Sequence, residues 1–237
     1  MNKIFWKLFI FILLFLVSCD KAKFYWTEVS NSDIEFYDEN ISRVQEESSG
    51  ENFFKYSLFY KDIQPQEVNN VYAKNLGYDI CGFEGKLKYE SGAIKYFGFI
   101  FNLNTDTNCF YFLRFTKNGT LCVSYYDGST KNISDLAEIP NSQNSWLANS
   151  VNLVRVQSLE TGEIEIFINN ALCYTIYSPI LTYGALGIFE MLDENDLTNY
   201  SPSSPMISLY QINKLQKISW IAMGVATTCG GLALLVE

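Results

Sequence analysis

The sequence predicts an all-β chain that folds as an antiparallel sandwich of two sheets. Aromatic residues are abundant, with 18 Phe and 16 Tyr, and such side chains favour strands. Several stretches alternate apolar and polar residues with a period of two, and tight-turn sequences separate them at short intervals. No segment with a helical period competes between residues 51 and 214, so this range is expected to form one sandwich domain.

Residues 1–18 are expected to form a signal peptide. Lys3 and Lys7 flank the start of an unbroken apolar stretch, Leu8–Val17, which is shorter than the roughly 20 residues of a spanning helix. Leu16-Val17-Ser18-Cys19 resembles the bacterial lipobox. That resemblance implies cleavage before Cys19 and lipidation of its thiol, which would hold the domain on the exported side of a bacterial cell membrane or outer membrane. The alternative is an ordinary signal peptide with a chance cysteine.

Composition excludes several classes of function. Without residues 1–18 the chain carries 15 basic and 26 acidic side chains, a formal charge of −11. Such a surface argues against nucleic acid as a partner and against electrostatic adhesion to anionic lipid. The chain has no histidine, which excludes Ser-His-Asp and Cys-His catalysis and imidazole metal sites. Apart from Cys19, the cysteines show no CxxC spacing, so buried free thiols are favoured over disulfides.

The elements follow in chain order. Residues 19–50 are polar and mixed, and they are expected to form a lipidated tether and an irregular lead-in, with one early strand at Ser32–Tyr37. In Tyr78–Glu90, alternation places Phe83 and Leu87 on one face and Glu84 and Lys86 on the other. The other expected strands are Phe53–Tyr60, a stretch with Phe97, Phe99, Phe101 and Leu103 on one face, Asn108–Thr116, Thr120–Tyr126, Val151–Ser158, Glu163–Asn169, Ala171–Tyr177, a strand opening at Gly184, and Pro205–Lys214.

Tight turns join several of these strands. Asn118-Gly119 predicts a type I′ hairpin turn, because both central residues of that turn need positive φ. Thr161-Gly162 and Asn169-Asn170 predict two more hairpins. Asp135–Ser150 is expected to be the one long connection, with a turn of helix.

An ordered set of motifs resembles the concanavalin A-like lectin/glucanase superfamily. The motifs are YFGFIFNLNTDTNCFYFLRFTKNGTLCVSYY, then SVNLVRVQSLETGEIEIFINNALCYTI, then YGALGIFEML. They are most similar to laminin-G-like domains and to the 3-keto-disaccharide hydrolase domains of bacterial lipoproteins. The resemblance covers about residues 24–214 and implies a jelly-roll sandwich of two curved antiparallel sheets.

The candidate ligand residues each have a structural alternative. Arg114 and Arg155 lie in expected strands, where they would clamp a carboxylate or pair with an acid of the strand face. Tyr125, Tyr126 and Trp146 would stack on sugar rings or pack in the core.

The acidic residues that could bind calcium or act in a glycosidase also have structural alternatives. In the loop NTDTN, Asp106 and Asn108 would bind calcium through oxygen ligands or form a polar turn, and no other cofactor is expected. Glu163 and Glu165 alternate with isoleucine, and Ile168 stands where a glucanase motif of this superfamily would place a third acid. A solvated strand face explains these two glutamates, so a glycosidase site is not expected there.

Residues 218–236 form an uncharged apolar segment of 19 residues, long enough to span a bilayer as a helix of roughly 28 Å. Lys214 and Lys217 precede it, a basic flank that favours the cytoplasm and conflicts with an exported domain. The alternatives are a buried or membrane-surface apolar tail, or a chain whose C-terminus belongs to something longer.

We therefore expect a lipid-anchored envelope protein whose sandwich binds a glycan or another envelope protein without catalysis. A carbohydrate-active hydrolase of the 3-keto-disaccharide type is one alternative, although the chain lacks the histidine that such chemistry often uses. A purely structural envelope lipoprotein is the other.

Overall fold

The computed structural model describes residues 23–28, 41–48, 54–60, 69–72, 80–193 and 207–218. The chain divides into two compact units, Trp26–Leu215 and a second unit composed of Met1–Tyr25 and Gln216–Glu237. The expected signal peptide, Cys19, the early strand at Ser32–Tyr37 and the apolar tail beyond Ile218 lie outside the described residues. Within the described ranges, no helix is long and apolar enough to cross a membrane.

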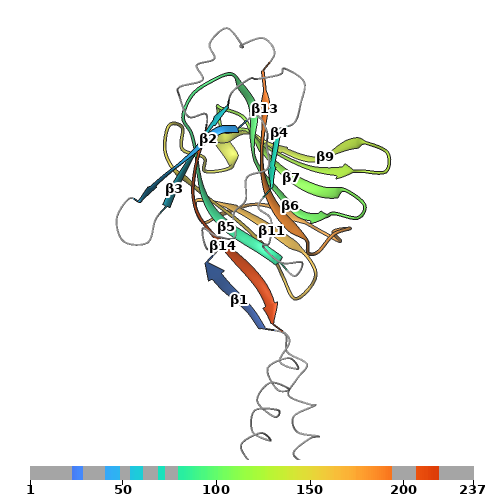
Figure 1. Ribbon diagram of the computed structural model, residues 1–237. Coiled ribbons are helices and arrows are strands. Elements are labelled where there is room, and N and C mark those ends of the chain that lie inside the picture. The colour runs from blue at the N-terminus through green and yellow to red at the C-terminus, as the bar shows by residue number, and fades with distance from the viewer. Residues whose placement is uncertain are drawn as a thin grey trace, which may run out of the picture. The chain divides into compact units, whose positions relative to one another are not determined.

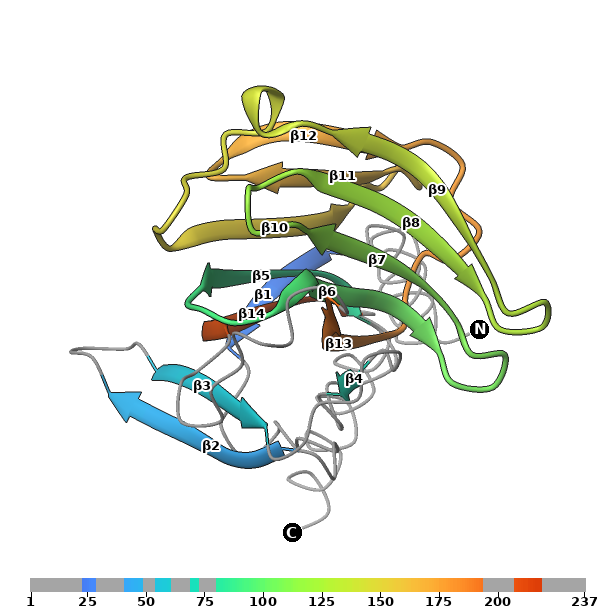
Figure 2. The ribbon, with the colours of Figure 1, turned by 90° about the horizontal axis from the view of Figure 1, so that it is seen from above.

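Two sheets form the described part of the chain, and the neighbouring strands whose registers are described run antiparallel (Figures 1 and 2). Sheet A has the order β12 (Ala171–Ile176), β11 (Ile164–Ile168), β10 (Asn152–Ser158), β5 (Ile80–Tyr89), β14 (Ile207–Ile218), β3 (Phe54–Tyr60) and β2 (Ile41–Ser48), and β1 (Lys23–Glu28) also pairs with β14. Sheet B has the order β4 (Asn69–Tyr72), β13 (Ala185–Leu192), β6 (Ile94–Asn104), β7 (Cys109–Phe115), β8 (Leu121–Asp127) and β9 (Asn132–Ile139). Figure 2 shows the two sheets layered, with β9 to β6 of sheet B following one another in the same direction as β12 to β5 of sheet A.

The main core lies between the inner faces of the two sheets. On β11, Ile164, Ile166 and Ile168 are fully buried, whereas Glu165 and Phe167 point outward. The rings of Phe83 on sheet A and Phe99 on sheet B lie 4.8 Å apart between their centroids. The predicted antiparallel jelly-roll sandwich and its period-two alternation are therefore confirmed.

Two of the predicted turns have different outcomes. Asn169 and Asn170 have φ values of 50° and 67°, which fit the type I′ turn that joins β11 and β12. The type I′ prediction at Asn118-Gly119 is wrong, because only Gly119 has positive φ, at 85°. Its N–H donates to Thr116 O at 2.8 Å, so the turn runs from Thr116 to Gly119, and Gly119, its last residue, has the left-handed conformation. A Cβ at Gly119 would lie 2.2 Å from Cδ1 of Trp146, so glycine is required there for space as well as for φ.

Several strands lie where the sequence predicted irregular structure. β9 runs to Ile139, into the stretch expected to be a connection, and the expected helical turn is a single 3-10 turn at Asn141–Gln143. β9 is an edge strand whose first five residues are exposed, so it carries little apolar alternation that could reveal it. β1 and β2 lie within the expected irregular lead-in, and the short edge strand β4 was not predicted either.

A bulge in β6 moves one predicted core residue to the other face. The register with β7 shifts between Phe101 and Asn104, and Asn102 has a φ of 52°. Phe97, Phe99 and Phe101 remain in the main core, but Leu103 joins a separate cluster on the outer face of sheet B. The expectation that all four share one face is therefore wrong at Leu103, because a bulge resets the alternation.

The structure describes four cysteines, each as a thiol outside any disulfide, as predicted. Cys81, Cys109 and Cys122 are buried and Cys173 is half-buried.

Candidate functional site

The outer face of sheet B carries both an apolar cluster and an ionic one. On β7, Phe110, Phe112 and Arg114 point outward, because Tyr111, Leu113 and Phe115 belong to the main core. The register places Ser124 of β8 between Phe112 and residue 135 of β9. The outer cluster consists of Ile100, Leu103, Phe110, Phe112 and Phe189, all 5% exposed or less.

Arg114 is the centre of a hydrogen-bonded array that reaches toward the sheet edge. Its Nε and Nη2 donate to Ser124 Oγ at 3.2 and 2.8 Å, and Nη2 also donates to Oδ1 of Asp135. Ser124 Oγ in turn donates to the same Asp135 oxygen at 2.8 Å. The guanidinium also lies over the ring of Tyr96, 5.0 Å from its centroid.

Exposure is divided unevenly within this array. The Arg114 side chain is 9% exposed and Ser124 is fully buried, whereas the Asp135 side chain is 63% exposed. A buried guanidinium needs hydrogen-bonding partners, and here they also fix the carboxylate in one orientation. Within the described part of the chain, Oδ2 of Asp135 has no hydrogen-bond partner and remains available to one.

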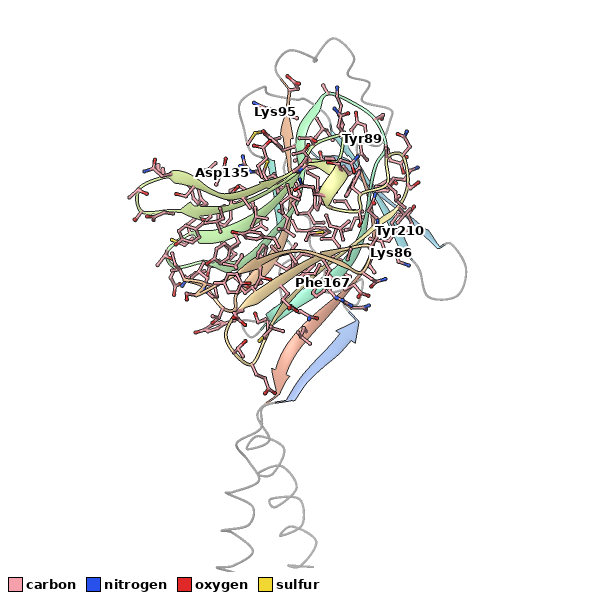
Figure 3. The ribbon with its side chains drawn as sticks, turned by 180° about the vertical axis from the view of Figure 1, so that it is seen from behind. Lys86, Tyr89, Lys95, Asp135, Phe167 and Tyr210 are labelled. Carbon is pink, nitrogen blue, oxygen red and sulfur yellow. The ribbon has the colours of Figure 1, made fainter. Side chains whose placement is uncertain are left out.

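A partly exposed aromatic ring lies beside this array. Tyr126 stands on the outer face of β8, with its ring 4.9 Å from that of Phe110, and it pairs across the strands with Ile133, which is 44% exposed. We call Tyr96, Arg114, Ser124, Tyr126 and Asp135 the Arg114 site. The exposed carboxylate and the tyrosine edge make it a polar surface with an apolar border, open over β8 and β9. In Figure 3, Asp135 is labelled on one side of the domain and Lys86 and Tyr210 on the other.

The other predicted ligand residues lie elsewhere. Tyr125 points to the inner side, with its ring 5.3 Å from that of Tyr111. Burial, together with a hydrogen bond to Cys109, raises the pKa of Tyr125 to about 12. Trp146 is buried between Phe97 and Phe115 and stacks on the latter at 4.7 Å, so its ring is occupied by core packing and is not presented to a ligand.

Arg155 lies on the outer face of sheet A and does not meet Arg114. Its guanidinium carbon is 4.4 Å from the ring centroid of Phe167 on the neighbouring strand. On the same sheet, Glu165 accepts a hydrogen bond from Gln157 at 3.1 Å, and Glu163 accepts one from Thr161 at 2.6 Å. Both glutamates therefore have ordinary strand and turn partners.

Asp106 and Asn108 lie in the turn between β6 and β7. The backbone N–H groups of Asp106 and Thr107 donate to Asn104 Oδ1 at 3.0 and 3.1 Å, and Asn108 has a φ of 53°. Among the described residues, no three Cys, Asp or Glu side chains gather in a metal-binding group. Calcium binding at this turn stays a prediction.

Of the three residues in the hydrogen-bonded array, only Arg114 was predicted as a ligand-binding residue. Tyr126 was named for its ring, but Asp135 was assigned to a connection and Ser124 and Tyr96 were not singled out. Asp135 and Glu138 flank the apolar Leu136 and Ala137 in an edge strand, a weak pattern that a hairpin reading of residues 121–139 would have detected.

Comparisons with known proteins give remote likenesses. No protein-family model matches the chain, and no curated protein matches it in sequence. Its structure is similar to a carbohydrate-binding module from Bacillus subtilis, with 11% identity over 81% of this chain and 92% of that one and a TM-score of 0.44. It is also similar to a galectin from Caenorhabditis elegans (15% identity, 72% and 99% covered, TM-score 0.42) and to a β-glucanase from Bacillus licheniformis (12%, 81% and 92%, 0.44). At these levels the likenesses do not indicate a ligand.

Proposed function

We propose that this protein binds neutral glycans at the Arg114 site, without catalysis, while a lipid at Cys19 holds it at a bacterial envelope. The observation that carries the proposal is the exposed Asp135 carboxylate, which is held in place by Arg114 and Ser124 beneath it. A carboxylate in a fixed orientation accepts hydrogen bonds from sugar hydroxyls, and charge-assisted bonds of this kind are the stronger ones.

The charge of the site favours neutral over acidic sugars. Asp135 already neutralises Arg114, so the guanidinium is not free to clamp a sugar carboxylate. Glu138 lies on the same outer face, opposite Cys122, and adds a second negative charge to the edge. An anionic glycan would meet repulsion here from the site and from the net charge of the whole chain.

The apolar border supports the same class of ligand. Tyr126 is half-buried against Phe110, which fixes its ring, and Ile133 beside it is exposed. Ordered apolar surface next to a hydrogen-bond acceptor suits the C–H face and hydroxyl edge of a pyranose.

The role of Asp135 supports binding without catalysis. A glycosidase needs one carboxyl group that donates a proton and a second carboxylate that acts as nucleophile or base. Asp135 instead accepts hydrogen bonds from a guanidinium and a hydroxyl, which suits a binding group. The sandwich could instead be a hydrolase, which would release reducing ends, or a purely structural protein, which would bind no neutral ligand.

The test measures binding of neutral and uronic-acid polysaccharides by calorimetry, after a glycan array has selected the ligand. Asp135→Ala should weaken binding by about tenfold or more, the cost of one charge-assisted hydrogen bond. Glu165→Gln is the matched control, because that glutamate is hydrogen-bonded on the outer face of sheet A. No neutral ligand, equal loss in both variants, or release of reducing ends by the wild-type protein would each contradict the proposal.

The anchor has its own test. Metabolic labelling with a fatty acid should label the wild-type chain and not the Cys19→Ala variant. Label that persists on Cys19→Ala would contradict the proposed anchor while leaving the glycan site untouched.

A further inference from the structure

The loop between β12 and β13, residues 177–184, exposes an unusual amount of apolar surface. Tyr177, Ile180 and Tyr183 are 73%, 72% and 59% exposed. The loop also lies within a long uncharged stretch, because no charged residue occurs between Glu165 and Glu190. Three large exposed apolar side chains within seven residues indicate a surface that meets something other than water.

The backbone of this loop is held firmly by side chains from three strands. Three consecutive residues each make one such bond: Ile180 N–H to Tyr111 Oη (2.8 Å), Asn102 Nδ2–H to Leu181 O (3.0 Å) and Ser158 Oγ–H to Thr182 O (3.2 Å). Leu181 packs against the main core. The apolar side chains are therefore presented on an ordered support, so their exposure does not result from a frayed loop.

The loop lies at the end of the sandwich toward which β14 runs. Thr182 contacts Ser158 at the end of β10, and β10 runs antiparallel to β5 with Gln157 opposite Gly82. On the other side of β5 lies β14. Its residue Ser208 bonds to Glu90, just beyond the end of β5, and its later residue Ile212 lies beside Gly85 within β5, so β14 runs toward the start of β5. From Ser208 to Ile212, β14 thus runs toward the end that holds residues 177–184.

The chain that follows Cys19 enters sheet A through β1, the neighbour of β14. β1 pairs with β14, and Trp26 of β1 is only seven residues beyond Cys19, a reach of at most about 25 Å. A lipid on Cys19 would therefore keep this sheet close to a bilayer.

We propose that residues 177–184 form a membrane-docking loop that inserts Tyr177, Ile180 and Tyr183 into the lipid interface beside the anchor. The proposal rests on the lipid anchor of the proposed function for its orientation. Tyrosine suits this place, because its ring enters the apolar boundary while its hydroxyl stays with the headgroups.

The surroundings of the loop favour zwitterionic over anionic lipid. The adjacent turn between β10 and β11 carries Glu160 and Glu163, and the loop itself has no basic residue. Apolar insertion next to acidic residues gains nothing from an anionic surface, so phosphatidylcholine vesicles are the appropriate probe.

The experiment places a photocrosslinking residue in the full chain, reconstituted in phosphatidylcholine vesicles. Ile180→p-benzoylphenylalanine reports on the loop. Leu147→p-benzoylphenylalanine is the matched control, because Leu147 is 56% exposed and bonds to Asn152 at the opposite end of β10 from Ser158. Fatty-acid labelling of the same preparation reports the anchor separately.

A several-fold excess of lipid adduct at position 180 over position 147 supports the loop proposal, with or without fatty-acid label on Cys19. Equal adduct at both positions, or adduct of position 180 to another protein, overturns it even where Cys19 is labelled. In a second variant pair, Tyr183→Asp should reduce the lipid adduct at position 180 several-fold, and Tyr183→Phe should not. Equal adduct in these two variants also overturns the proposal.

Discussion

Replacing Ile166 with alanine should destabilise the domain far more than replacing its neighbour Glu165. Ile166 is fully buried on the inner face of β11, opposite Val156 on β10 and Tyr174 on β12. Strands on both sides hold the backbone, so the site cannot collapse around the missing atoms. Ile166→Ala should therefore cost about 2–5 kcal/mol, the range for truncation of a buried aliphatic side chain.

Glu165 provides the comparison on the same strand. It points outward, and among the described residues its side chain accepts one hydrogen bond, from Gln157 at 3.1 Å. Glu165→Ala should cost about 0.5–1 kcal/mol, the net contribution of one partly exposed hydrogen bond.

Urea unfolding followed by tryptophan fluorescence measures both changes. With an m-value of about 3 kcal/mol/M, the midpoint of Ile166→Ala should fall by about 1 M and that of Glu165→Ala by about 0.3 M or less. Equal shifts would show that the register of β11 is wrong. The assignment of Ile164, Ile166 and Ile168 to the space between the sheets would then be wrong as well.

Three further predictions follow from the turns, the ion pair and the thiols. Gly119→Ala and Gly162→Ala both place a Cβ on a residue with positive φ, which should cost about 1–2 kcal/mol each. Only the Cβ at position 119 would meet Trp146, so the Tm of Gly119→Ala should fall further than that of Gly162→Ala, and equal losses would contradict the Gly119–Trp146 packing. Ser124→Ala removes the acceptor of Arg114 Nε, so thermal unfolding should show a loss of about 1–3 kcal/mol, and an unchanged Tm would contradict the array. A hydrogen bond with Thr107 lowers the pKa of the Cys109 thiol, whereas burial raises the pKa of the Cys122 thiol. Peptide mapping after treatment with iodoacetamide at pH 7.5 should therefore find Cys109 alkylated before Cys122, and the reverse order would contradict these pKa directions.

The sequence predicted those parts of the fold in which local pattern and tertiary structure agree. β5 and β11 alternate because one face of each is buried in the main core, and Asn169-Asn170 forms its turn because both residues accept positive φ. β9 escaped prediction because an exposed edge strand is under little pressure to alternate. Leu103 was misplaced because a bulge resets the alternation at Asn102, whose side chain bonds to Leu181, 79 positions along the chain, where no local pattern could reveal it.

The Arg114 site shows the same division. Arg114 could be singled out as a charged residue among apolar neighbours in a predicted strand. Its partners could not, because Ser124 and Asp135 come from two other strands and only the register brings them together. The sequence left Trp146 open between a sugar-stacking ring and a core residue for a related reason, since its position between Phe97 and Phe115 depends on the path of a loop that carries no periodic pattern.

The two proposed surfaces are compatible because they use different sides of one domain. The Arg114 site lies on the outer face of sheet B, where side chains stand perpendicular to the strands, at the exposed edge strand β9. The loop of residues 177–184 lies at the end of the strands, where β12 leaves sheet A and β13 enters sheet B. A domain that rests on a bilayer with its strand ends would therefore hold Asp135 along the side of the sandwich, clear of the lipid. Glycan binding should then be equal for the vesicle-bound wild-type protein and for Tyr183→Asp, since the hydrogen bonds of the ion pair and the ring contacts of Tyr126 run to side chains of β7, β8 and β9. A glycan affinity that fell in Tyr183→Asp would show instead that the loop is part of the glycan site.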